Sequence, residues 1–292
     1  MSRQVKNIIN ISVFLICIAL INIAGQNIEL EIRGVNAFTF ILIVAVLVQV
    51  IFFIPSFLLK TEKYYDLVGS LTYITTISFA YFAVEDKTII DSIIYFYVMI
   101  WASRLGIYLF RRVQKDGKDV RFEKAKRHFF WFLQYWMGQA LWVCLTACAA
   151  IIAILSPEDD SLPVLAIVGM ALWLTGFTIE SVSDYQKRAF RKDNNPSQSF
   201  IHTGLWARSR HPNYFGEITL WIGIAVIALN TLTGVEYITL ISPVFVYVLL
   251  TRMSGINLLE SIADERYGDL EEYQRYKRNT PVLIPKLSKD KK

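Results

Sequence analysis

The chain has 292 residues, of which 54% are hydrophobic and only 19% are charged, and its mean hydropathy is +0.40. Soluble domains contain about 45–50% apolar and about 25% charged residues, so this composition excludes an ordinary soluble protein and a disordered chain. Three cysteines are too few for a disulfide framework. Because the apolar residues are concentrated in long runs, we expect a polytopic integral membrane protein built from helices.

Eight apolar runs approach or reach the length of about 20 residues that a helix needs to cross a bilayer. In chain order they are 8–24, 36–57, 66–84, 89–109, 135–155, 162–182, 216–231 and 236–251. Cys17, Cys144 and Cys148 fall inside these runs, where small buried thiols are the expected state. We therefore predict an all-α bundle of about eight transmembrane helices.

The basic residues lie almost entirely on one side of this arrangement. Of the 30 Lys and Arg residues, 27 fall at the N-terminus, in every second loop or in the tail, whereas only Arg33 and Lys87 fall on the opposite side. Since cytoplasmic loops carry the excess of Lys and Arg, both termini are expected in the cytoplasm. The net charge of +5 then reflects topology and anionic membrane lipids. It indicates no nucleic-acid partner and no required protein partner.

Motifs of soluble enzymes are absent from the sequence. There is no G-x-G-x-x-G, no P-loop, no H-E-x-x-H and no G-x-S-x-G. The three histidines are too dispersed to predict a metal site. The chemistry is therefore expected from polar side chains that lie in or beside the membrane spans.

The strongest candidate is the run 204–217, which leads into the seventh span. Pro212 fixes its own φ and favours a helix that begins near Asn213, where free N–H groups attract an anion. The side chains that crowd around this start are Arg210, His211, Asn213 and Tyr214. Glu217 follows one turn after Asn213 at membrane depth, where a carboxylate is costly and usually functional. The alternative is an interfacial belt that only anchors the helix.

A second candidate closes the sixth span. Its members share one helical stripe because their spacings are 4, 4 and 3, and they are Glu180, Asp184, Arg188 and Arg191. Asp184 and Arg188 are also consistent with an exposed ion pair of little energetic value. Glu180 favours a functional role for the stripe, because it lies inside the apolar run.

A third candidate lies in the first half of the chain. Asp66 begins the third span beside Tyr65, and Trp101 and Arg104 lie in the fourth span. The cytoplasmic loop that follows carries Arg111, Arg112, Lys115 and Arg121. A structural interpretation is also open, in which Asp66 caps a helix and the arginines only set the topology.

The tail after residue 252 contains Glu260, Tyr273 and Tyr276, followed by T-P-V-L-I-P at 280–285. Helical spacing over 258–276 predicts one amphipathic helix at the membrane interface. A second interpretation is that this helix closes a cytoplasmic cavity.

Several of these segments resemble the steroid 5-alpha-reductase C-terminal superfamily, and above all its uncharacterised, mainly bacterial, reductase-like branch. The matching elements are D-Y-Q-K at 184–187, Phe190, T-G-L-W at 203–206, R-H-P-N-Y-F-G-E at 210–217, S-G-x-x-L-L-E at 254–260 and E-x-Y-x-x-Y from 271. Part of the 210–217 motif is shared with sterol reductases and isoprenylcysteine methyltransferases. The resemblance covers roughly 60–287, which predicts N-terminal helices over 1–60, a reductase-like domain over 61–287 and a basic tip at 288–292.

The resemblance implies a seven-helix core preceded by one extra helix, NADPH bound from the cytoplasmic side, and reduction of an activated C=C bond in a lipid. By position, the matched cofactor residues are Arg112, Asp184, Arg191, Asn213, Glu217 and Glu260, the last standing where the family has Tyr. With Arg188, Arg210, His211 and Tyr214 they form the predicted cofactor set. Glu180 replaces a family Asn.

The resemblance also implies a substrate site on the early spans. Asp66 is the counterpart of a family Glu that holds the substrate carbonyl, and Trp101 stands at the position of its partner Tyr. An indole N–H donates a hydrogen bond but supplies no proton, which argues against a steroid itself as substrate. We predict that protonated Asp66 polarises the carbonyl, with Trp101 at the position of the partner donor and with Tyr65 and Tyr73 as reserve donors.

The expected function is therefore NADPH-dependent reduction of an enone-like lipid, steroid-like or isoprenoid substrate, with no metal. The expected location is a bacterial inner membrane rather than the endoplasmic reticulum. Two alternatives remain open: an S-adenosylmethionine-dependent methyltransferase of the isoprenylcysteine type, and a non-catalytic lipid-binding protein. The methyltransferase cofactor has no 2′-phosphate and would not require the arginines at 112, 188 and 191.

Overall fold

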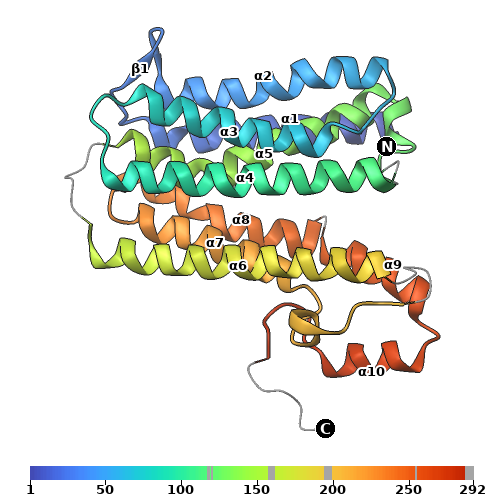
Figure 1. The fold of residues 1–292 in the computed structure, drawn as a ribbon. Helices are drawn as coiled ribbons and strands as arrows, with labels where there is room; N and C mark the ends of the chain where they lie inside the picture. Colours follow the sequence, from blue (N-terminus) through green and yellow to red (C-terminus); the bar gives the residue numbers. More distant parts are fainter. Residues whose placement is uncertain (117–118, 120, 157–161, 194–198, 254, 287–292) are drawn as a thin grey trace. The chain divides into compact units, whose positions relative to one another are not determined.

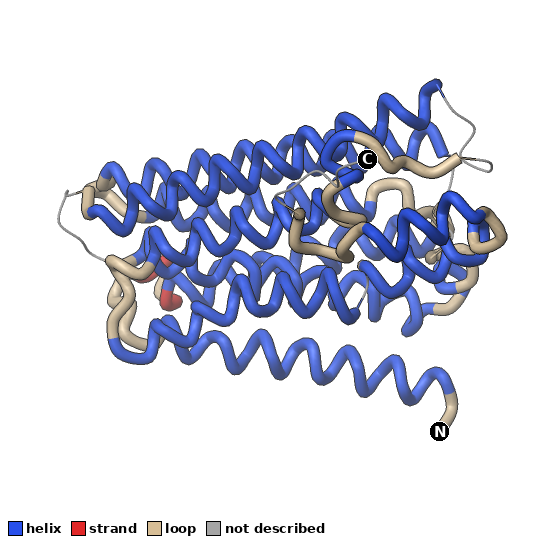
Figure 2. Tube along the Cα trace, turned by 90° about the horizontal axis from the view of Figure 1, so that it is seen from below, coloured by secondary structure: helices blue, strands red, loops and turns tan. Residues whose placement is uncertain are grey.

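The computed structural model describes residues 1–116, 119, 121–156, 162–193, 199–253 and 255–286, so the predicted basic tip lies outside the described residues. Within them, regular structure is almost entirely helical, and the strands form one short hairpin (Figures 1 and 2). The protein is an all-α polytopic membrane bundle, as its composition predicts. It divides into two compact units: unit 1 is Met1–Ala166 with Ile227–Ser242, and unit 2 is Ile167–Val226 with Pro243–Lys292.

Unit 1 contains five long helices that lie side by side with nearly parallel axes (Figure 1). They are α1 (Arg3–Ile21), α2 (Ala37–Leu58), α3 (Tyr65–Ala83), α4 (Ile89–Asp116) and α5 (Phe129–Leu155). Helix α5 is apolar around its whole circumference and packs against the other four. A helix of this kind is expected at the centre of a bundle.

Aromatic side chains hold α3 and α5 together near the start of α3. The Tyr65 and Trp136 rings meet edge to face with centroids 5.4 Å apart, and Phe132 packs against the same Trp136 ring at 6.0 Å. The Tyr65 hydroxyl also donates to the Tyr135 carbonyl at 2.9 Å. These contacts fix the first turn of α3, which carries Asp66.

The hairpin that joins α1 to α2 pairs β1 (Glu31–Ile32) with β2 (Val35–Asn36). Its turn uses Arg33 and Gly34, both of which have positive φ. Asn36 then caps α2, because its side-chain oxygen accepts from the Thr39 N–H at 3.1 Å. The second span therefore begins where the apolar run predicts.

Unit 2 is built from the remaining helices and the segments that join them. They are α6 (Val164–Asp193), the 3₁₀ turn Gly204–Ala207, α7 (Pro212–Ala228), α8 (Ile241–Val248), the π turn Leu249–Met253, α9 (Ile256–Tyr267) and α10 (Glu271–Asn279). The first residues of α6 and of α8 and the last residues of α7 belong to unit 1. Helix α7 begins at Pro212, as predicted. Helix α6 continues eleven residues past the apolar run that ends at residue 182, so the stripe 180–191 is helical throughout.

The prediction of one helix over 258–276 is wrong. Helix α9 ends at Tyr267, and the Gly268 N–H donates to the Asp264 carbonyl at 2.9 Å. A Cβ on Gly268 would lie 2.5 Å from that carbonyl oxygen, so the close turn requires glycine. The chain then reverses into α10, whose Tyr273 and Lys277 contact Asp264 on α9.

Six helical segments of the described residues are long and apolar enough to cross a membrane. They are Arg3–Gly25, Ala37–Leu58, Ile89–Lys115, Phe129–Leu155, Val164–Asp193 and Gly234–Tyr267. Helices α3 and α7 also occupy the predicted spans 66–84 and 216–231. The last span opens with 3₁₀ turns over Gly234–Leu240 that its apolar pattern does not predict. Eight spans with cytoplasmic termini stay a prediction.

Candidate functional site

The first part of the 204–217 run docks on α6. Gly204 adopts a positive φ of 63°, and a Cβ at this position would lie 2.6 Å from the Gln186 side-chain amide. The Gln186 oxygen accepts from the Leu205 N–H at 3.0 Å, and the buried Trp206 indole donates to the Ser183 carbonyl at 3.1 Å. The T-G-L-W turn is therefore hydrogen-bonded to α6 at and next to the D-Y-Q-K segment.

The middle of the run pairs with the C-terminal tail in the manner of two short extended strands. The contacts are the Arg210 N–H to the Pro281 carbonyl at 2.9 Å, the His211 N–H to the Val282 carbonyl at 3.1 Å, and the Ser209 hydroxyl to the Leu283 carbonyl at 2.7 Å. Backbone hydrogen bonds of this kind restrict both segments at once. The tail therefore holds Arg210 and His211 in place.

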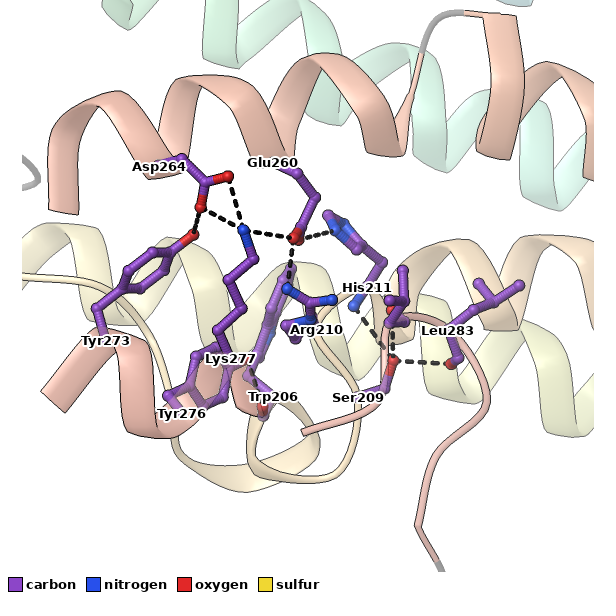
Figure 3. A network of polar contacts seen from close by, with 11 residues as sticks. Trp206, Ser209, Arg210, His211, Glu260, Asp264, Tyr273, Tyr276, Lys277 and Leu283 are labelled. Atoms are coloured by element: carbon purple, nitrogen blue, oxygen red, sulfur yellow. Dashed lines mark hydrogen bonds and ion pairs between the residues drawn. The ribbon is translucent and has the colours of Figure 1, made fainter. Parts of the chain in front are cut away.

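Glu260 on α9 joins these two side chains (Figure 3). One carboxylate oxygen accepts from the Arg210 guanidinium, and the other lies 2.8 Å from His211 Nε2. Lys277 on α10 lies 3.9 Å from the same carboxylate and 2.5 Å from Asp264. The run, α9 and α10 consequently share one network of charged hydrogen bonds, which are stronger than neutral ones.

His211 is buried inside this network, and burial lowers the pKa of its imidazole below the ordinary value. The hydrogen bond and charge of Glu260 act in the opposite direction but do not overcome burial. A neutral ring carries one N–H, and an ionised carboxylate only accepts. We therefore assign the proton to His211 Nε2, which leaves Nδ1 as an acceptor.

Two tail tyrosines complete the framework. The Tyr276 hydroxyl donates to the Trp206 carbonyl at 2.7 Å, and the Tyr273 hydroxyl donates to Asp264 at 3.0 Å (Figure 3). Burial raises the pKa of both phenols, so both stay protonated at neutral pH. The C-terminal part of the chain therefore contacts the 204–217 run at two places, at Trp206 and at residues 209–211.

Helices α6 and α7 approach so closely that their backbones touch at glycines. A Cβ on Gly216 would lie 2.5 Å from the Glu180 backbone nitrogen, and one on Gly176 would lie 2.5 Å from the Leu220 nitrogen. Glu180 and Glu217 are accordingly buried, at 2% and 6% exposure. Asp184 is buried too, whereas Arg188 and Arg191 are exposed. Small residues permit such close contacts between membrane helices. A buried carboxylate beside such a contact requires polar partners.

In unit 1, Asp66 lies among arginines. Its carboxylate is 3.5 Å from the Arg112 guanidinium and 3.9 Å from that of Arg121. Asp66 does not cap α3, because the N-cap residue is Tyr64 and no side chain bonds the cap. Trp101 is fully buried on α4, and its ring meets Tyr73 edge to face at 5.0 Å.

Asp119 extends this cluster outside the membrane spans. It binds Arg121 through both carboxylate oxygens, at 2.6 and 3.0 Å. Burial raises the pKa of Asp119, but the hydrogen bonds and charge of Arg121 outweigh it, and the net pKa is lowered. Arg121 is thereby held next to Asp66.

Comparison with known proteins identifies the family to which this site belongs. A family described as "Protein of unknown function (DUF1295)" matches residues 52–280, which is more than three-quarters of the chain. The chain belongs to the DUF1295 family. This family is part of the steroid 5-alpha-reductase-like superfamily, so the resemblance inferred from the motifs is confirmed.

The DUF1295 chain is also similar to curated enzymes. It is 31% identical over 121 residues to mouse 3-oxo-5-alpha-steroid 4-dehydrogenase 1, covering 41% of this chain and 42% of that protein. The rat protein of the same name is 30% identical over 119 residues, covering 41% and 40%. The matched part therefore spans only about two-fifths of these relatives. No solved structure matches the chain.

The structure distributes the predicted site residues between the two units. Unit 1 holds Tyr65, Asp66, Trp101 and Arg112, of which Asp66 and Arg112 are in contact. Unit 2 holds Asp184, Arg188, Arg191, Arg210, His211, Asn213, Tyr214, Glu217 and Glu260. Glu260 joins Arg210 to His211, and the His211 and Tyr214 rings stack at 5.7 Å. Arg188 instead lies over its neighbour Tyr185.

Sequence reasoning missed the residues that hold this framework. Lys277 belongs to no predicted set, and Ser209 and Gln186 lie in quoted motifs but receive no role from the sequence. Gly176 and Gly216 were missed as well, although a second glycine follows Gly216 by seven residues, at Gly223, and also touches α6. Glycines repeated every seven residues on an apolar helix were a usable signal. The pairing of residues 209–211 with the tail has no signal of this kind in the sequence.

Proposed function

We propose that this DUF1295 protein is an NADPH-dependent membrane reductase of a C=C bond conjugated to a carbonyl in a lipid substrate. Membership of the steroid 5-alpha-reductase-like superfamily supports a reductase. The names of the similar curated proteins describe dehydrogenation of 3-oxo-5-alpha-steroids at position 4. Removing hydrogen next to a ketone is the reverse of the reduction proposed here.

One observation supports the proposal: the 204–217 run is hydrogen-bonded to α6, to α9 and to the tail. A membrane anchor needs aromatic and basic side chains at the surface. Here His211, Ser209 and Trp206 are buried and hydrogen-bonded instead. Polar side chains that are held in place by several hydrogen bonds are typical of binding sites.

The residues present fit a dinucleotide. Arg210 Nε is buried and makes no hydrogen bond within the described residues, so this donor beside His211 has no partner there. In the proposal, Asn213, Tyr214 and Glu217 hold the nicotinamide end, and Asp184, Arg188 and Arg191 hold the adenosine end with its 2′-phosphate. Glu260 completes the set in unit 2, and the assignment of Arg112, which belongs to unit 1, stays a prediction. The bound cofactor would supply the hydride.

Polarisation of the substrate carbonyl is assigned to residues of unit 1. A donor facing the carbonyl oxygen stabilises the negative charge that builds there during hydride addition. Tyr65 and Asp66 would have to exchange their present partners, the Tyr135 carbonyl and the Arg112 guanidinium, for that oxygen. Trp101 is the third candidate, and its indole N–H would donate without transferring a proton.

The test is cofactor binding by purified protein in mild detergent. Asn213→Ala and Glu217→Gln are expected to abolish NADPH binding while the protein stays monodisperse, because both residues project from the first two turns of α7. The matched control is Glu265→Gln, which removes an exposed carboxylate from the same unit. Normal NADPH binding by both variants would show that the 204–217 run is not a cofactor site and has only a structural role. Binding of S-adenosylmethionine alone would favour the methyltransferase.

A further inference from the structure

A buried ion pair in unit 1 joins the segment 121–127 to the loop that precedes α3. Glu62 is only 4% exposed, and one of its carboxylate oxygens lies 2.8 Å from the Lys126 ammonium group. The other oxygen accepts from the Asp119 N–H at 3.2 Å. Both oxygens of one buried carboxylate therefore bind residues that lie between α4 and α5. Removing one partner of such a pair leaves an uncompensated charge, so the pair is a strong constraint on both segments.

An aromatic contact fixes the same segment from the interior of unit 1. Phe122 is fully buried, and its ring centroid lies 4.7 Å from that of Tyr65 and 4.9 Å from that of Tyr135. Aromatic pairs at such distances favour particular mutual orientations. Because Arg121 directly precedes Phe122, the ion pair of Glu62 and this aromatic contact together restrict where the arginine guanidinium lies.

The guanidinium that is positioned in this way faces Asp66. Arg121 lies 3.9 Å from one Asp66 carboxylate oxygen, and Arg112 lies 3.5 Å from the other. Asp119, whose N–H is bound by Glu62, binds the Arg121 guanidinium through both of its own carboxylate oxygens. A chain of contacts therefore joins Glu62 to Asp66 by way of this arginine. An arginine at such a distance favours the ionised form of a carboxyl group.

We propose that Glu62 is a positioning residue, which holds Arg121 beside Asp66 and so sets how readily this carboxyl group leaves its arginine partners for a substrate carbonyl. Glu62 acts through Arg121 and is not itself a catalytic residue. The catalytic consequence rests on the proposed function, in which Asp66 polarises the carbonyl. The position of Arg121 is set by the contacts of unit 1 whether or not that function is correct.

The experiment measures how fast Asp66 reacts with dicyclohexylcarbodiimide, an apolar reagent that modifies protonated carboxyl groups. The full chain is labelled in mild detergent, and each carboxyl is followed by peptide mass spectrometry. Glu62→Gln and Lys126→Met are each expected to raise the labelling rate of Asp66 at least about tenfold, because a displaced Arg121 no longer favours the ionised carboxylate. Lys126→Arg keeps the ion pair and should label at the wild-type rate. Lys63→Gln, which removes the exposed cation next to Glu62, is the matched control.

Two comparisons separate positioning from a general loss of packing. Glu236 is also buried in unit 1, where it accepts from the Thr233 N–H at 2.8 Å, so its labelling rate should stay constant in every variant. In protein that already carries Arg121→Gln, adding Glu62→Gln should bring no further increase at Asp66, because the residue through which Glu62 acts has been removed.

Unchanged labelling of Asp66 in Glu62→Gln and Lys126→Met overturns the proposal. An equal rise at Asp66 and Glu236 overturns it as well, and so does a further increase in the Arg121→Gln background. Failure of the proposed function is seen separately, as normal NADPH binding by Asn213→Ala and Glu217→Gln.

Discussion

Units 1 and 2 hold their helices together in opposite ways. In unit 1, large aromatic side chains such as Phe53, Phe132 and Trp136 fill the space between α2, α3 and α5. In unit 2, α6 and α7 meet at Gly176 and Gly216 with no side chain between them. The difference teaches which kind of substitution each unit resists. A packed aromatic core is sensitive to loss of volume, whereas a backbone-to-backbone contact is sensitive to added volume.

The comparison predicts that adding volume damages unit 2 most. Gly216→Ala places a methyl group 2.5 Å from a backbone nitrogen of α6, and backbone cannot move aside cheaply. We expect a loss of at least about 4 kcal/mol in stability, seen as failure to recover folded protein in detergent. Gly138→Ala is the control, since its new methyl group meets only the Phe14 side chain at 3.4 Å. Equal recovery of folded protein for Gly216→Ala and Gly138→Ala would contradict the proposed difference between the two units.

Removing volume is expected to damage unit 1 instead. Phe132→Ala deletes a fully buried ring that packs against Phe53, Phe122 and Trp136. Stability should fall by about 3–4 kcal/mol, which is typical of large cavities in packed interiors. Thermal unfolding in detergent measures the effect, and Phe82→Ala is the control because Phe82 is 69% exposed. A similar loss for both rings would show that burial in the bundle is not what matters.

Unit 2 is also where the cofactor preference is expected to lie. Arg191 is exposed on α6, and in the proposal it contacts the 2′-phosphate that distinguishes NADPH from NADH. Arg191→Ala should weaken NADPH binding about tenfold and NADH binding little, because one charge-assisted contact is lost. Lys192→Ala removes the adjacent exposed cation and serves as the control. A wild-type protein with equal affinity for both dinucleotides would contradict the assignment.

The smallest expected effect concerns pH. Burial lowers the pKa of His211 in the folded protein below the ordinary value of 6.5, so the unfolded chain binds a proton that the folded chain resists. Stability is therefore full above pH 6.5 and decreases as the pH falls below it. Thermal unfolding at several pH values should show this slope, and His211→Gln should flatten it. The exposed His128 of unit 1 gives the matched control, His128→Gln, for which the slope should persist.

The residues that the sequence could predict are those whose signal is local. The apolar runs indicate the helices because hydropathy and bilayer thickness set their length. Pro212 marks the start of α7 because proline fixes its own backbone. The motif 210–217 and the stripe 180–191 indicate the cofactor candidates in the same way. The break at Gly268 escaped this reasoning because its amphipathic spacing continues across the turn.

Tertiary structure alone decided which partners these residues have. Glu260 lies about fifty residues from Arg210 and His211, and the Pro281 and Val282 carbonyls lie more than seventy residues from the N–H groups that they accept. Such contacts depend on where α9, α10 and the tail fold back, and loop closure over these lengths leaves no periodic trace in the sequence. The contact of α6 with α7 at glycine is likewise a property of two surfaces. The sequence by itself determined a membrane bundle and its polar candidates; the packing of helices far apart in the chain determined which of those candidates contact one another.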